Sequence, residues 1–192
     1  MSAPVICLGE CLVDRLFDVG RSSQDLTNYT DYPGGAPANV AAAIAKLGNP
    51  SRLVSALGQD AQGDWLLQVL QARGVDCQIQ RVDAATRTVL VQRDETGDRQ
   101  FIGFSRPDPT VFADAFLAPE WIDTVDFDGV DYLVVGTLGL AYPTTAGAMA
   151  RARQKAEQAG TKLIIDLNWR PVFWPNQDTA PQRIREFLTA AD

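Results

Sequence analysis

Short runs of apolar residues alternate with stretches of helical periodicity along most of the chain. Four of these runs are rich in valine, leucine and isoleucine, as buried strands are: residues 5–8, 51–57, 132–135 and 162–165. Other segments carry apolar residues at every third or fourth position, which predicts helices at about 37–47, 60–73, 144–159 and 181–190. Apolar strands separated by helices indicate an α/β fold, a doubly wound parallel sheet covered on both faces. Such sheets bind ligands at the carboxyl ends of their strands.

Three segments, at 77–82, 86–93 and 99–104, break this pattern. Polar and apolar residues alternate in them, and a glycine-containing turn at 94–98 joins the last two. The arrangement predicts an antiparallel hairpin within a small sheet beside the main domain. A sheet in that position is suited to act as a flap or lid.

The composition is that of one globular unit, and it excludes several classes of function. A chain of 192 residues with 46% hydrophobic residues permits one good-sized domain. The net charge of −7 argues against broad binding to nucleic acids or anionic membranes, because their phosphates would repel the chain. No apolar run is long enough to cross a bilayer, and the first residues lack a signal peptide, so we expect a cytoplasmic protein.

Few reactive side chains are available. Cys7, Cys11 and Cys77 match no zinc or thioredoxin spacing, and we expect them to be reduced. The chain has no histidine, which removes Ser-His-Asp and Cys-His nucleophiles and histidine-ligated zinc. Any chemistry must therefore use carboxylates, lysine, arginine, hydroxyls, backbone amides or a bound ion.

The most informative segment runs from Gly34 to Gly48. Gly34 and Gly35 let another molecule approach the backbone, and the helix that begins near Pro37 presents free N–H groups at its first turn. Asn39 stands just before the apolar face of this helix and is left to bond a partner near the first turn. An oxygen-rich ligand would suit this site. The alternative is that the glycines only allow a tight turn and close helix packing.

Three side chains elsewhere are candidates for ligand contact. Asp14 follows the first strand region, where its carboxylate could accept hydrogen bonds from sugar hydroxyls, although a turn carboxylate is the simpler interpretation of the position alone. Phe104 and Arg106 share strand parity at the end of the predicted hairpin. They would direct a ring and a guanidinium to the same side of the lid, although an exposed arginine is the commoner outcome.

Asp166, Asn168 and Arg170 follow the strand at 162–165, at the edge where doubly wound folds bind ligands. They alternate, so all three could face one crevice. Asn168 and Arg170 could bind phosphate, and Asp166 could serve a metal-water shell, orient Arg170, act as a general base or only cap the turn. Neither a P-loop motif nor a Gly-x-Gly-x-x-Gly after the first strand is present, which disfavours P-loop and dinucleotide-binding proteins.

Together these motifs resemble the PfkB family of carbohydrate kinases, the ribokinase-like family, and within it the fructokinase branch. The resemblance covers essentially the whole chain and is most specific in the diglycine segment. It rests on Gly9-Glu10 with Asp14, Gly34-Gly35-Ala36-Pro37-Ala38-Asn39-Val40-Ala41, Gly58-Gln59-Asp60 with Gly63, Arg106-Pro107, and Asp166-Leu167-Asn168-Trp169-Arg170 with Trp174-Pro175.

The resemblance implies a doubly wound αβα ribokinase-like core with a small antiparallel β lid, incomplete at the C-terminus. Residues 1–192 would form the N-terminal part of one kinase domain, with lid segments at about 14–32 and 77–106. The implied reaction transfers the γ-phosphate of ATP, with magnesium, to a sugar hydroxyl, most simply of fructose. The implied sugar contacts are Asp14, Gly34, Gly35, Asn39, Phe104 and Arg106, and the implied phosphate-side residues are Asp166, Asn168 and Arg170.

The chain departs from the family pattern at one point, because the Gly-Ala-Gly-Asp motif that supplies an anion-binding helix start and the base is absent. We therefore assign no catalytic residue, expect the base beyond Asp192 in a longer parent protein, and expect this chain alone to be inactive. A noncatalytic sugar-binding or regulatory module is the alternative. Ribose, 2-keto-3-deoxygluconate and nucleosides stay open as substrates. The small sheet also predicts a homodimer paired through the lid.

Overall fold

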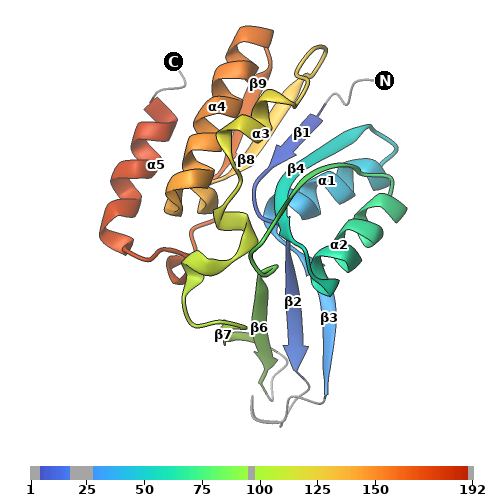
Figure 1. Ribbon diagram of the computed structural model, residues 1–192, viewed down its shortest axis with the longest axis vertical. Coiled ribbons are helices and arrows are strands. Elements are labelled where there is room, and N and C mark those ends of the chain that lie inside the picture. The colour runs from blue at the N-terminus through green and yellow to red at the C-terminus, as the bar shows by residue number, and fades with distance from the viewer. Residues whose placement is uncertain (1–4, 18–27, 95–97, 190–192) are drawn as a thin grey trace.

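A five-stranded parallel sheet forms the main layer of the protein (Figure 1). The computed structural model describes residues 5–17, 28–94 and 98–189. The strands lie in the order β5-β4-β1-β8-β9, and every neighbouring pair is parallel. Their bounds are β1 (Val5–Leu8), β4 (Ser51–Gly58), β5 (Asp76–Val82), β8 (Tyr132–Gly136) and β9 (Lys162–Asp166).

Helices cover both faces of this sheet, as predicted. The five α-helices of the described residues are α1 (Ala36–Lys46), α2 (Ala61–Ala72), α3 (Pro119–Asp123), α4 (Pro143–Ala159) and α5 (Ala180–Thr189). Successive residues of β1 point to opposite faces: Ile6 and Leu8 belong to the core packed by α3, α4 and α5, and Cys7 to the core packed by α1 and α2. Because both faces are buried, the central strand is apolar without interruption.

Local signals position the helix ends close to where the sequence predicts them. Asp60 caps α2, where its carboxylate accepts a 2.8 Å hydrogen bond from the Gly63 N–H. Gly160 ends α4 in the left-handed conformation, with φ at +72°. Gly35 precedes α1 with φ at +95°, a conformation that a side chain would strain. None of the described helices is long and apolar enough to cross a membrane.

A four-stranded sheet, which we call the lid, extends from the end of the main sheet at the bottom of Figure 1. It comprises β2 (Leu12–Phe17), β3 (Tyr29–Gly34), β6 (Thr88–Arg93) and β7 (Arg99–Phe104), in the order β3-β2-β6-β7. The predicted hairpin of β6 and β7 is confirmed. However, β2 and β6 pair in parallel, so the lid is a mixed sheet and not the purely antiparallel one expected. Residues 18–27 of the expected lid, 95–97 of its turn and 190 of the last helix lie outside the described residues.

The assignment of residues 77–82 to the lid is wrong. They lie in β5, which pairs in parallel with β4 from Arg52↔Asp76 to Gly58↔Val82 at the edge of the main sheet. An edge strand is only partly covered, and no residue of β5 is fully buried. Its sequence therefore carries the half-buried alternation that also marks a lid strand.

Candidate functional site

A cavity of about 790 Å³ lies between the lid and the carboxyl ends of the core strands. The strand order of the main sheet reverses at β1. The next strand of this sheet along the chain, β4, lies on one side of β1, and β8 lies on the other. Doubly wound folds bind ligands in the crevice at such a point. The wall is supplied by the turn after β1, the four lid strands β2, β3, β6 and β7, the start of α1, and the segments that follow β8 and β9.

Five of the residues predicted from sequence line this one cavity. Asp14 comes from β2, Gly35 and Asn39 from the start of α1, and Asn168 and Arg170 from the loop after β9. They bring carboxylate, amide and guanidinium groups to a single space. The prediction that these separated motifs share a site is therefore consistent with the fold.

Gly34, another of the predicted sugar contacts, lies against Asp14. A Cβ built on Gly34 would overlap the carboxylate and stand 2.8 Å from its Cγ. Burial raises the pKa of Asp14, and the positive charge of Arg99 lowers it. Gly34 thus leaves room for a carboxylate that is held against the cavity wall.

Phe104 and Arg106 are not brought to the cavity wall. β7 ends at Phe104, and Arg106 is exposed beyond it. Phe104 packs against Phe101 and Phe173, with ring centroids 5.0 and 5.1 Å apart. Their closure over a ligand stays a prediction.

Arg99 and Phe101 of β7 line the cavity instead. The pairing register between β6 and β7 shifts at Leu90 and Val91, so Phe101 opposes Val91 while Gly103 opposes Leu90. A bulge of this kind reverses which residues point inward. Strand parity counted along the sequence does not detect it.

Asp166 also stands apart from the cavity. It is exposed at the end of β9, and its Oδ1 accepts a 3.0 Å hydrogen bond from the Asn168 N–H. Asn168 has φ at +31°, a conformation that asparagine tolerates better than most residues. Asp166 therefore shapes the turn that directs Asn168, which corresponds to the capping alternative considered above.

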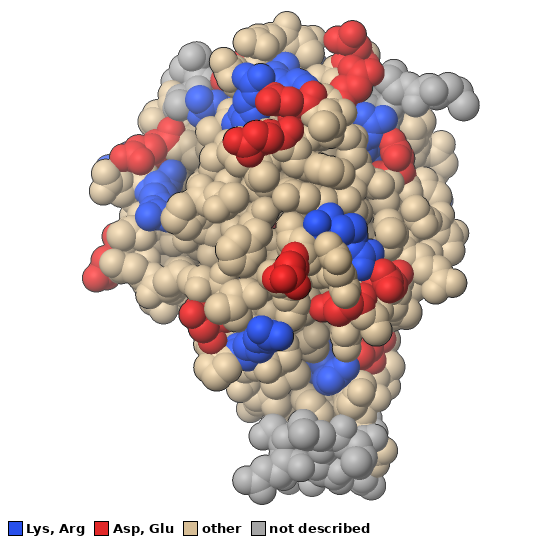
Figure 2. Space-filling model, viewed as in Figure 1, with Lys and Arg blue, Asp and Glu red and all other residues tan. Residues whose placement is uncertain are grey.

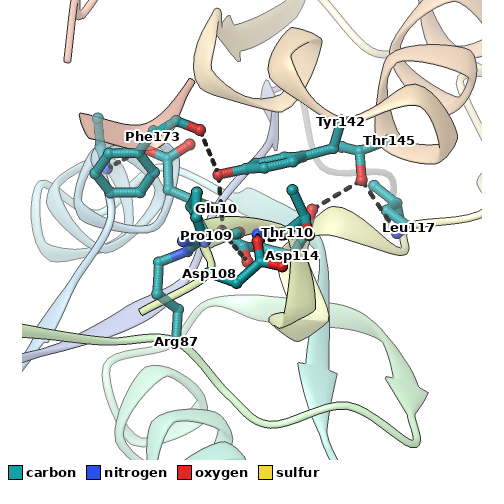
Figure 3. A network of polar contacts seen from close by, with 11 residues as sticks. Glu10, Arg87, Asp108, Pro109, Thr110, Asp114, Leu117, Tyr142, Thr145 and Phe173 are labelled. Carbon is teal, nitrogen blue, oxygen red and sulfur yellow. Dashed lines mark hydrogen bonds and ion pairs between the residues drawn. The ribbon is translucent and has the colours of Figure 1, made fainter. Parts of the chain in front are cut away.

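A buried polar network beneath the cavity was not predicted from the sequence (Figure 3). Arg87 is fully buried, and its guanidinium makes two hydrogen bonds to the Asp114 carboxylate, at 2.8 and 2.9 Å. Its Nη2 also donates to the Pro109 carbonyl at 2.8 Å and to the Tyr142 hydroxyl at 3.0 Å. Tyr142 in turn donates to the carbonyl of Phe173, at 2.8 Å. The network ties the base of the lid to the loop that carries Asn168 and Arg170.

Glu10 is the buried acid of the cavity floor and is 4% exposed. Its Oε1 accepts a 3.1 Å hydrogen bond from the Ala36 N–H at the start of α1. Burial raises its pKa to about 7, with smaller lowering effects from hydrogen bonds to backbone N–H groups. The Gly9-Glu10 motif was the only signal of this residue in the sequence.

Surface charge offers no competing site on the face shown in Figure 2, where acidic and basic side chains are interspersed. Within residues 5–17, 28–94 and 98–189, no group of three or more His, Cys, Asp or Glu side chains could hold a metal ion.

The parallel sheet, its lid and the cavity between them define a protein of the ribokinase-like α/β fold. The fructokinase of Xylella fastidiosa superposes with a TM-score of 0.85 at 31% identity, over 98% of this chain and 57% of that one. A second structure of that enzyme, with bound ATP, superposes with a TM-score of 0.84 at 29% identity, over 100% of this chain and 60% of that one.

The chain belongs to the pfkB family of carbohydrate kinases, which it matches over residues 2–192. Fructokinase-2 of Solanum lycopersicum is 31% identical over 100% of this chain and 58% of its own length. Probable fructokinase-4 of Arabidopsis thaliana is 32% identical over 98% of this chain and 57% of its own length. The chain therefore spans a little over half the length of these relatives.

Proposed function

We propose that this chain forms the sugar-binding and lid portion of an ATP-dependent sugar kinase that acts on fructose. The observation that carries the proposal is the convergence of Asp14, Gly35, Asn39, Asn168 and Arg170 on one cavity at the strand-order reversal. Relatives named as fructokinases match the chain from end to end and support fructose as the sugar. An ATP-bound neighbour supports ATP as the phosphate donor.

The proposed roles follow from the chemistry of each group. Asp14 accepts hydrogen bonds from sugar hydroxyls, and Asn39 both accepts from and donates to them. Gly34 and Gly35 let the sugar approach the backbone. Asn168 and Arg170 lie on the phosphate side, where a guanidinium suits phosphate oxygens. Catalysis of this kind rests mainly on positioning and on neutralising charge, and magnesium is expected to arrive with the ATP phosphates. We assign no base within the chain.

The test is ATP-dependent phosphorylation of a sugar panel by this chain and by the protein from the longest surrounding reading frame. Activity in the longer protein alone, strongest with fructose, supports the proposal. Sugar binding by both proteins with phosphorylation by neither refutes the kinase and supports the noncatalytic sugar-binding module.

A pair of variants tests whether the cavity binds the sugar. Asp14→Asn should raise the KM for fructose about tenfold or more while leaving the KM for ATP unchanged, because a charged hydrogen-bond acceptor is lost. Asp128→Asn changes an exposed turn carboxylate and serves as the matched control. Equal effects of the two substitutions would contradict the proposed sugar site.

The lid is also proposed to pair two copies of the chain. Tyr29 and Ile102 of the lid strands are 41% and 37% exposed and lie outside the cavity wall. Exposed aromatic and aliphatic side chains on one small sheet favour contact with a second copy. Light scattering that finds only monomers at high concentration would contradict this pairing.

A further inference from the structure

Glu10 lies at the carboxyl end of β1, where the strand order of the main sheet reverses. It follows β1, and a Cβ built on Gly136, at the end of the neighbouring strand β8, would stand 3.5 Å from its Oε2. The side chain therefore reaches beneath the crevice at the carboxyl ends of both strands. It lines the cavity from below and is almost fully buried.

The start of α1 depends on Glu10 for its capping partner. The residue before the helix is Gly35, which has no side chain to offer, and the first turn contains no acidic residue. Glu10 supplies the missing acceptor through Oε1, at 3.1 Å from the Ala36 nitrogen. The backbone of Gly35 also rests directly on that of Glu10, since a Cβ on Gly35 would overlap the Glu10 carbonyl oxygen. Both the side chain and the backbone of Glu10 thus fix the turn that faces the ligand.

The second carboxylate oxygen has no partner among the described residues. Oε2 is buried and makes no hydrogen bond. Three ionisable side chains from other elements interact electrostatically with this carboxyl group: Arg87, Asp114 and Tyr142. Arg87 is committed to Asp114, and its charge only partly offsets the cost of burying a second carboxylate.

We propose that Glu10 is a positioning residue of the sugar site, whose carboxylate holds the Gly35–Ala36 turn in the geometry that receives the sugar. This inference rests on the proposed function. The carboxylate makes a charge-assisted hydrogen bond to Ala36 and lies at the positive end of the helix dipole. Protonation weakens both interactions, and burial brings the pKa of Glu10 to about 7. The turn is therefore held most firmly above neutral pH.

The first measurement follows the Ala36 amide by NMR from pH 5.5 to 8.5 and needs no sugar. The Ala36 amide shift of the wild-type protein should titrate near pH 7, and this step should vanish in Glu10→Gln. Absence of the step in the wild type would overturn the inference whatever the sugar data show.

The second measurement is the dissociation constant for fructose without ATP over the same pH range, in the protein from the longest reading frame. Wild-type affinity should fall about fivefold from pH 8 to pH 6, as a charge-assisted bond becomes neutral. Glu10→Gln should bind with the weaker affinity throughout. Glu10→Asp keeps the charge but shortens the reach to Ala36, and should bind weakly at every pH.

Glu120→Gln is the matched control, because Glu120 is exposed in the first turn of α3. Asp14 also faces the cavity. Because it is present in the wild type and in all these variants, its contribution to the pH dependence of fructose binding is the same in each and cancels in the comparison. If the Ala36 step is present but Glu10→Gln and wild type bind fructose with the same pH profile, Glu10 does not position the site. If no sugar binds at any pH while the Ala36 step is present, the proposed function fails and the link from Glu10 to the turn stands.

Discussion

The Arg87–Asp114 pair permits a quantitative test of the buried network. Arg87 is 0% exposed at its side chain and Asp114 is 5% exposed. Asp114→Asn keeps the shape of the side chain and removes its charge. The guanidinium would then keep only neutral acceptors, which are one amide oxygen at position 114, the Pro109 carbonyl and the Tyr142 hydroxyl. It would remain a buried positive charge without a negative partner.

The expected loss follows from this burial. Removing one partner of a buried ion pair costs roughly 3–5 kcal/mol, because the other charge is left uncompensated. For a chain of 192 residues this corresponds to a fall in Tm on the order of 10 °C. An exposed pair is worth less than about 1 kcal/mol.

The assay is urea unfolding at pH 7.5, since urea does not screen ion pairs. The matched control is Asp123→Asn, which removes an ion pair of similar length, 2.7 Å, to Arg151 at the surface. Combining Asp114→Asn with Arg87→Met should recover part of the loss, because the orphaned charge is then gone. Equal, small losses for Asp114→Asn and Asp123→Asn would refute the reasoning.

Two further predictions concern the cavity. The first is that the wild-type chain should lose stability relative to Glu10→Gln as the pH rises from about 5 to 8, by an amount on the order of 3 kcal/mol. The reason is that folding raises the pKa of Glu10 from 4.5 to about 7. In that pH range the folded state binds a proton that the unfolded state has lost. Urea unfolding of both proteins at each pH should therefore show a difference in the free energy of unfolding that grows with pH and levels off above pH 8. A difference that does not change with pH would contradict the burial argument. Gly34→Ala should displace the Asp14 carboxylate and raise the KM for fructose about tenfold with an unchanged KM for ATP. An unchanged KM for fructose would mean that the carboxylate of Asp14 does not contact the sugar.

The sequence predicts the core of this fold well because the core follows periodic rules. β1 and β8 are buried on both faces, and the helices between strands begin and end at residues such as Asp60 and Gly160. β5 was misplaced because an edge strand and a lid strand share one half-buried pattern. β3 was missed as a strand because four of its six residues are exposed or glycine, and it contains Pro33.

The site was predictable where a local motif carries it and not elsewhere. Gly35 and Asn39 belong to one short segment whose chemistry is visible in the sequence. Arg99 was not identified, because a bulge set by long-range pairing decides which lid side chains face inward. Arg87 and Asp114 meet only after folding, and no spacing along the chain marks them as partners.

The parallel pairing of β2 with β6 makes completion of the lid depend on segments that are far apart in the sequence. Each of the two lid hairpins joins strands that follow one another in the chain, whereas β2 and β6 are separated by α1, β4, α2 and β5. We expect those intervening elements to pack into the main sheet before the two hairpins meet, because closing so long a loop costs entropy that their packing would offset. We therefore expect the lid to be completed late and the cavity beneath it to be among the last features to form. A ligand that binds this cavity would consequently select chains that have finished folding.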